Sequence, residues 1–284
     1  MPAPGGSFPL TLRDDAGREV TFAAPPQRIV SLAPSHTEAV YALGAGERLI
    51  AADTYSDYPS DARQKAILNC WPKPPLEKIV SLRPDLVLLF TEGAPVVQQM
   101  EALKLPVVKL FPESLEQTYT TLLRLGQLLG RSGPAEQVVT EMRARVAAVQ
   151  ERVRGATTPT VLFELDALDP ARPFVAGGSG FYGELLTLAG TRNLFSDLKQ
   201  PAGPVRAEQI LSRNPEILFL GDTASPISPQ SPDTVRRRPG WNTLKAVRAG
   251  RVYPVQSVRL TRASPRLVEG LEEIARLAHP ERFR

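Results

Sequence analysis

One segment of the chain occurs twice, and this repeat constrains the fold more than any other feature of the sequence. Residues 76–89 match residues 207–220 at a constant spacing, and in both copies a proline separates a short amphipathic stretch from an apolar run. A proline at this place ends a helix, and the apolar run has the length of a buried strand. Two copies, one in each half of the chain, predict two related lobes rather than a solenoid. A weaker repeat relates residues 38–44 to residues 184–190.

Short apolar runs alternate with amphipathic stretches in both halves. Continuous apolar runs separated by helices are typical of parallel sheets that helices cover on both faces. The predicted strands are residues 28–32, 85–90 and 106–110 in the first half, and 160–165, 216–220 and 252–255 in the second. The fold class is therefore α/β, with two Rossmann-like lobes built on parallel sheets.

The clearest helix pattern lies between the two halves. It begins near Pro134, a residue suited to a first helical turn, and ends at Gly155. A helix of this length spans about 30 Å, roughly the diameter of a small domain. We therefore expect an N-terminal lobe over residues 1–131, a backbone helix over 132–156 and a C-terminal lobe over 157–284. In such proteins ligands bind in the cleft between lobes, near the carboxyl ends of the strands.

Composition narrows the functional classes. The chain has 284 residues, of which 42% are hydrophobic and 23% charged, as in ordinary globular proteins. Its 34 basic residues are scattered among 30 acidic ones, and the only dense basic run is 236–238, so we expect no nucleic-acid partner. Residues 1–7 lack the pattern of a secretion signal, so we expect that a signal was removed or precedes the chain's start.

Motifs for catalysis are absent from the sequence. No dinucleotide-binding glycine motif, phosphate-binding loop or nucleophile elbow occurs, and the glycine-rich run 177–180 fits a turn better than an anion cradle. Two histidines and one cysteine offer too few ligands for a tight metal site. We therefore predict a protein that is not an enzyme and has neither metal nor resident cofactor.

Aromatic residues in predicted loops are the best candidates for ligand contacts, because rings outside the core suit a flat, bulky, partly apolar ligand. Tyr55, Trp71 and Phe90 follow strands or lie in proline-rich loops of the first half. Phe174 and Phe181 lie in predicted loops of the second half. His36 follows the first predicted strand, where it either belongs to the first turn of a helix or contacts the ligand.

Several motifs in the same order resemble those of periplasmic cobalamin-binding proteins of ABC importers, within the wider family of siderophore, haem and cobalamin solute-binding proteins. The similar motifs lie at 28–35, 55–59 with the following Trp71, 238–241, 250–253 and 262–266. The resemblance implies a receptor at the periplasmic or outer face of the membrane. It further implies a monomer that delivers a small-molecule ligand to an ABC transporter permease dimer.

The resemblance also assigns roles to particular residues. It implies corrinoid contacts from Tyr55, Trp71, Phe90, Phe174 and Arg262, and docking of Glu77 and Glu208 to permease arginines. His36 and Phe181 are further candidate site residues from their places in the sequence. The sequence departs from the family pattern at Phe90, where a tryptophan is expected. An aromatic residue is missing near Gly203, and so is an acidic residue shortly before Arg262. Haem, a ferric siderophore and a lipophilic quinone therefore stand beside cobalamin as candidate ligands.

Overall fold

The chain forms two compact units. The structure, a computed structural model, describes residues 8–90, 94–223 and 229–284. The first unit comprises Met1–Met142 with Ala263–Pro265, and the second comprises Arg143–Arg262 with Arg266–Arg284. Within the described residues, no helix combines the length and apolar character that crossing a membrane requires.

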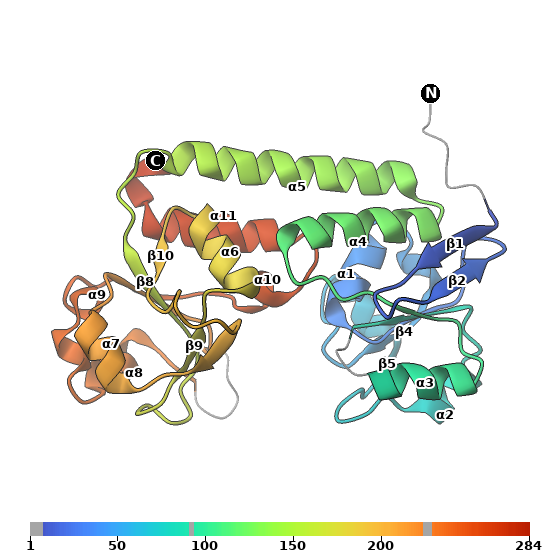
Figure 1. The fold of residues 1–284 in the computed structure, drawn as a ribbon, viewed down its shortest axis with the longest axis horizontal. Coiled ribbons are helices and arrows are strands. Elements are labelled where there is room, and N and C mark those ends of the chain that lie inside the picture. The colour runs from blue at the N-terminus through green and yellow to red at the C-terminus, as the bar shows by residue number, and fades with distance from the viewer. Residues whose placement is uncertain (1–7, 91–93, 224–228) are drawn as a thin grey trace. The chain divides into compact units, whose positions relative to one another are not determined.

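The first unit is built on a five-stranded parallel sheet. Its elements are β1 (Leu10–Arg13), β2 (Glu19–Phe22), β3 (Ile29–Ser31), α1 (Pro34–Ala42), β4 (Leu49–Asp53), β5 (Ala66–Leu68), α2 (Leu76–Ser81), β6 (Leu86–Leu89), α3 (Ala94–Ala102), β7 (Val107–Lys109) and α4 (Leu115–Leu128). The strands run in the order β5-β4-β3-β6-β7, all parallel, and β1 and β2 form a separate antiparallel hairpin. Figure 1 shows α1 and α4 on one side of the sheet and α2 and α3 on the other.

Burial of this sheet explains its sequence pattern. All residues of β3 and β6 are buried, as expected for central strands covered on both faces. The predicted strands 28–32, 85–90 and 106–110 are confirmed. The strands β4 and β5 and the hairpin were not predicted. Both β4 and β5 contain alanine, a residue with low strand preference.

The second unit contains a six-stranded sheet. Its elements are β8 (Thr160–Asp166), β9 (Phe174–Ala176), α6 (Gly180–Leu188), β10 (Arg192–Asn193), β11 (Ala202–Pro204), α7 (Ala207–Arg213), β12 (Ile217–Leu220), α8 (Pro232–Arg237), α9 (Lys245–Arg248), β13 (Val252–Pro254), α10 (Val258–Thr261) and α11 (Leu267–Ala278). The order is β11-β9-β8-β12-β13, with β10 beside the start of β8. The predicted strands are confirmed and parallel. At one edge β9 runs antiparallel to β8 and β11, a feature the sequence pattern did not indicate.

One continuous helix, α5 (Ser132–Val153), carries the chain from the first unit into the second. Its buried side chains recur at intervals of three and four residues: Ala135, Val139, Met142, Val146, Val149 and Val153. In the second unit, Arg145 of α5 donates two hydrogen bonds of 2.9 and 2.8 Å to Glu272 of α11. Gly155 follows with a φ of +70°, the left-handed conformation that glycine adopts most easily beyond a helix end.

The internal repeat adopts the same structure in both units. Residues 76–89 form α2 and β6, and residues 207–220 form α7 and β12. Arg83 and Asn214, which occupy one position of the repeat, both have a positive φ, of 47° and 49°. The two helices of the weaker repeat, α1 and α6, are both followed by a glycine with a φ of 72°. The two units are therefore similar even in the backbone conformation of individual turns.

An acidic residue at the start of each repeat strand holds the neighbouring strand. Asp85 accepts hydrogen bonds of 2.7 Å from the backbone amides of Gln27 and Arg28. Glu216 accepts bonds of 2.8 and 3.1 Å from the amide and hydroxyl of Thr160, and the amide bond helps to hold the pKa of Glu216 below its usual value. These bonds align the amino ends of β3 with β6 and of β8 with β12.

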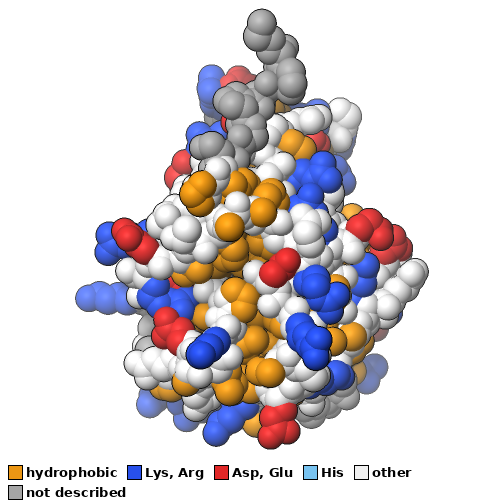
Figure 2. All heavy atoms as spheres, turned by 90° about the vertical axis from the view of Figure 1, so that its right-hand side faces the viewer, with side chains coloured by type: hydrophobic (Ala, Val, Ile, Leu, Met, Phe, Trp, Pro, Cys, Tyr) orange, Lys and Arg blue, Asp and Glu red, His pale blue; other side chains and the backbone are white. Residues whose placement is uncertain are grey.

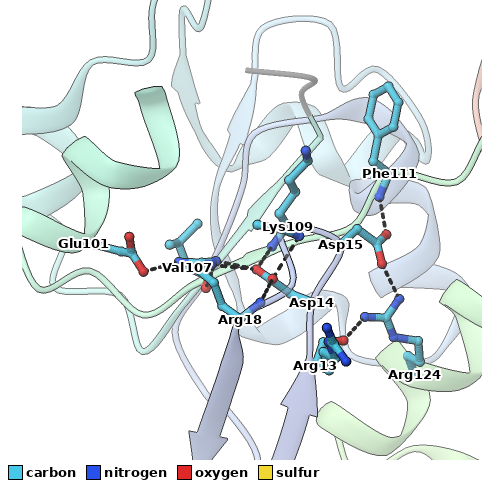
Figure 3. A network of polar contacts seen from close by, with 10 residues as sticks. Arg13, Asp14, Asp15, Arg18, Glu101, Val107, Lys109, Phe111 and Arg124 are labelled. Carbon is cyan, nitrogen blue, oxygen red and sulfur yellow. Dashed lines mark hydrogen bonds and ion pairs between the residues drawn. The ribbon is translucent and has the colours of Figure 1, made fainter. Parts of the chain in front are cut away.

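Two aspartates attach the β1–β2 hairpin to the rest of the first unit (Figure 3). Asp14 accepts hydrogen bonds from the side chain and amide of Arg18 and from the amide of Lys109, the last at 3.1 Å. Asp15 accepts a bond of 2.7 Å from Arg124 of α4. The hairpin is thus fixed to β7 and α4 by charged groups.

The surface of the first unit mixes charges of both signs. Figure 2 shows one face of this unit, with hydrophobic side chains along its middle. Basic and acidic side chains are interspersed around them rather than separated into areas of one sign. This face therefore does not present the continuous basic surface on which a nucleic-acid backbone would bind.

Asp14→Asn should lower the free energy of unfolding by about 2 kcal/mol at neutral pH, because a hydrogen bond to a charged group contributes roughly that much. Burial acts to raise the pKa of Asp14, but its bonds with Arg18 and the Lys109 amide outweigh burial and hold the pKa below 3.8. The carboxylate therefore stabilises the fold above its unfolded pKa, and the effect is lost as the pH falls through the lower folded pKa.

Urea unfolding of Asp14→Asn and wild type between pH 7 and pH 3 measures this effect. The difference between the two proteins should shrink as the pH falls below about 4. The exposed residue Glu19 on the same hairpin supplies the control, since Glu19→Gln should change the free energy of unfolding little across this pH range. A difference that stays constant down to pH 3 would contradict the assigned role of the carboxylate.

Candidate ligand-binding site

The predicted aromatic residues of the first unit lie at one edge of its sheet. Tyr55 follows β4, Trp71 follows β5 and Phe90 follows β6. These strands are parallel neighbours around β3, so their carboxyl ends meet at the same edge. Parallel pairing thus brings together three rings that are distant in the sequence.

Trp71 and Phe90 line a hollow of about 480 Å³ at this edge. The volume lies in the range usual for small-molecule sites. The other lining residues are mostly apolar: Leu32, Cys70, Pro72, Lys73, Pro74, Leu89, Pro95, Val96 and Gln99. Trp71 is 75% exposed, which is unusual for so large an apolar side chain. The hollow is suited to the apolar edge of a flat ligand.

Tyr55 lies on the loop after β4, is 62% exposed and does not line this hollow. The carboxylate of Asp53 accepts a hydrogen bond of 2.8 Å from the Tyr55 amide, while the Thr54 amide bonds the carbonyl of Leu68. A local side-chain bond of this kind fixes a turn. The loop is therefore held at its base, and the phenol is directed outward.

His36 lies beneath Phe90 rather than at the surface. It is 1% exposed, and its ring meets Phe90 edge to face with 5.9 Å between centroids, while Phe90 lies 4.6 Å from Phe111. Burial lowers the pKa of His36 to about 4, and the nearby carbonyl of Leu110 favours a proton without reaching hydrogen-bond geometry. The imidazole is neutral at physiological pH and supports the lining of the hollow from below.

The predicted residues of the second unit come from three elements. Phe174 is 40% exposed at the start of β9 and pairs with Asp166 at the carboxyl end of β8. Phe181 is half-buried in the first turn of α6, and Arg262 is half-buried directly after α10. Helices α6 and α10 are in contact, which brings the elements of Phe181 and Arg262 together.

The glycine-rich run 177–180 is required by close backbone packing. The amides of Gly177 and Gly178 donate to the carbonyls of Pro201 and Leu198 at 2.9 and 2.8 Å. A Cβ on Gly177 would lie 1.9 Å from the carbonyl oxygen of Gln200. These amides are already bonded within the chain, so the run is neither a flexible turn nor an anion cradle.

A buried charged network at the carboxyl end of β8 escaped the sequence analysis. Arg238 donates hydrogen bonds of 2.5 and 2.7 Å to the two oxygens of Glu164 and one of 2.7 Å to Gln230. Its guanidinium lies 4.4 Å from the ring of buried Trp241. Of the basic run 236–238, only Arg238 is buried. The available signal was Glu164, a carboxylate that interrupts the apolar run of β8.

The two predicted docking residues occupy equivalent exposed positions. Glu77 lies in the first turn of α2 and Glu208 in the first turn of α7. Glu208 borders an open surface hollow together with Arg206, Gln209 and Ser212. Each carboxylate is therefore accessible to a partner.

Comparison with known proteins places the chain in a family. A model of the periplasmic binding protein family matches residues 29–258. The chain is 36% identical over 199 residues to the vitamin B12-binding protein of Photorhabdus laumondii, covering 69% of this chain and 71% of that protein. It is also 29% identical over 287 residues to YvrC of Bacillus subtilis, an uncharacterized ABC transporter substrate-binding lipoprotein. That match covers 98% of this chain and 88% of YvrC.

A solved structure has the same fold. The periplasmic heme-binding protein RhuT from Roseiflexus sp. RS-1 matches with a TM-score of 0.80 and 24% identity, covering 90% of this chain and 99% of that one. The chain belongs to the periplasmic binding protein family. Its relatives include vitamin B12-binding proteins, and it shares its fold with a heme-binding protein. This confirms the predicted family and the prediction of a binding protein rather than an enzyme.

Arg238→Gln should lower the free energy of unfolding by about 3 to 5 kcal/mol, because it leaves the buried carboxylate of Glu164 without its cation. Arg237→Gln is the matched control: its side chain is exposed one residue away, and its effect should stay within about 0.5 kcal/mol. Urea unfolding of both variants measures the difference. Equal effects would show that the ion pair does not stabilise the second unit.

Proposed function

We propose that the chain captures a corrinoid outside the cytoplasmic membrane and delivers it, as a monomer, to the permease of an ABC importer. The observation that carries this proposal is the pairing of Trp71 with Phe90 around an apolar hollow at the carboxyl edge of the first sheet. A corrinoid is flat, bulky and partly apolar, so aromatic rings bury much of its surface at low entropic cost. The vitamin B12-binding relatives support the same ligand class.

We also propose that three residues of the second unit contact the ligand. Phe174 offers an exposed ring at the carboxyl end of β8, and Phe181 offers a second, half-buried ring. Arg262 supplies a donor for the polar periphery of the ligand. Of these three residues, Phe174 presents the largest exposed apolar surface.

Haem is the second candidate, because exposed Tyr55 offers a phenolate of the kind that ligates haem iron. His36 fits this role poorly, since its ring is buried beneath Phe90. The fold shared with a heme-binding protein is compatible with either ligand. Binding of haem with a tyrosinate-to-iron charge-transfer band would favour this candidate over the corrinoid.

Trp71→Ala should weaken corrinoid binding by about 2 to 4 kcal/mol, as expected for a central aromatic anchor. Trp71→Phe, which keeps an aromatic ring, should lose less binding free energy than Trp71→Ala. Leu103→Ala removes an exposed apolar side chain that does not line the hollow and should leave the affinity unchanged. Isothermal titration calorimetry with cobalamin and cobinamide measures all three variants. If Trp71→Ala binds cobalamin and cobinamide as tightly as wild type, the ligand does not bind at the hollow.

Docking to the permease is proposed to use Glu77 and Glu208. They stand at one position of the internal repeat, each exposed in the first turn of a short helix. Two equivalent carboxylates match a permease dimer whose subunits present arginines, because arginine bonds a carboxylate with two parallel hydrogen bonds. The docking residues are separate from the aromatic hollow.

Reversal of both charges, Glu77→Lys with Glu208→Lys, should abolish transport, because attraction to the permease arginines becomes repulsion. Ligand affinity should not change. The control pair Glu136→Lys and Glu141→Lys reverses two exposed carboxylates on α5 and should transport normally. Uptake in proteoliposomes, with calorimetry on the same proteins, separates the two effects. Wild-type uptake by the first double variant would refute the docking role.

A further inference from the structure

Asp222 is a buried carboxylate that accepts no hydrogen bond from the residues that the structure describes. It lies two residues beyond the end of β12, and the residue is only 5% exposed. Within the described part of the chain, neither carboxylate oxygen has a hydrogen-bond partner. Burying an ionised carboxylate without a partner is costly, so the group must either gain a partner or bind a proton.

The charged groups around Asp222 favour the proton. Glu164 and Asp166, both from β8, act on Asp222 as like charges, and Arg238 is the opposite charge that acts on it. The guanidinium of Arg238 is already bonded to both oxygens of Glu164 and to Gln230. Glu164 thus holds the available cation, and Asp222 is left beside a second carboxylate.

We propose that Glu164 and Asp222 form a proton-binding site at the carboxyl end of the second sheet, in which Asp222 holds one proton while Glu164 stays paired with Arg238. Two neighbouring buried carboxyl groups resist joint ionisation, and the proton belongs to the one that lacks the guanidinium. Burial raises the pKa of Asp222 to about 7, the charge of Glu164 adds to this, and Arg238 opposes it. Burial also acts to raise the pKa of Glu164, against the bonds from Arg238.

The proton makes the stability of the second unit depend on pH. In the unfolded chain Asp222 ionises near 3.8, whereas in the folded chain it does so near 7. Between these values folding takes up a proton, so stability falls as the pH rises through this window and stops changing above it. This is opposite in sign to the effect of Asp14, and the two groups act in different pH ranges.

A carbon-13 NMR titration of wild-type protein labelled at aspartate carboxyl carbons tests the site directly. One aspartate signal should titrate with a midpoint near pH 7, well above the usual value of 3.8. The pKa of Asp222 is raised, whereas those of Asp14 and Asp197 are lowered, and the signal absent from Asp222→Asn identifies Asp222. If every aspartate signal has completed its titration below pH 5, the proposal is wrong.

Asp222→Asn provides a second measurement, because it replaces the proton-binding group with a neutral one of the same shape. Relative to this variant, wild type should lose stability from about pH 5 to pH 7.5 and show a constant difference above pH 8. Asp233→Asn, which changes an exposed aspartate of the same unit, should follow wild type across that range. A constant difference between wild type and Asp222→Asn from pH 5 upward would overturn the proposal.

Discussion

The fold of each unit depends on one recurring interaction, a carboxylate that binds the start of a neighbouring buried strand. Asp85 bonds the backbone amides of residues 27 and 28, and Glu216 bonds Thr160. The central strands β6 and β12 are buried along their whole lengths and contain only apolar side chains, so no side chain within either strand can form a polar bond to a neighbouring strand. A polar bond at the amino end supplies the missing alignment. Both copies of the repeat contain this carboxylate, and in both it fixes the amino end of one central strand against its neighbour.

Alignment at the amino ends leaves the carboxyl ends free to differ. In the first unit they carry an apolar hollow with Trp71 and Phe90, supported from beneath by neutral His36. In the second unit the same edge carries the buried network of Glu164 and Arg238, with exposed Phe174 close by. Related backbones thus present different chemistry at equivalent edges, as expected for α/β folds that bind ligands there.

Features governed by local pattern were predictable from the sequence, and features governed by distant contacts were not. The repeat and the apolar runs identified the central strands and the helix that joins the units. The exposure of Trp71 was consistent with its place in a proline-rich loop. By contrast, Arg238 belongs to a basic run that the sequence alone would place at the surface. It is buried because it pairs with Glu164 of β8, which is distant in the sequence. The burial of His36 and the unpartnered Asp222 likewise arise from tertiary packing.

The two tryptophans of the chain allow a direct test of ligand binding at the aromatic hollow of the first unit. Trp71 is 75% exposed in the hollow, whereas Trp241 is 1% exposed in the core of the second unit. Indole signals in nitrogen-15 NMR spectra, assigned with Trp71→Phe, report on each separately. Adding cobinamide should shift the Trp71 signal until one equivalent is bound and leave that of Trp241 in place. An unchanged Trp71 signal with cobalamin, cobinamide, haem, ferric siderophore and quinone would contradict the account.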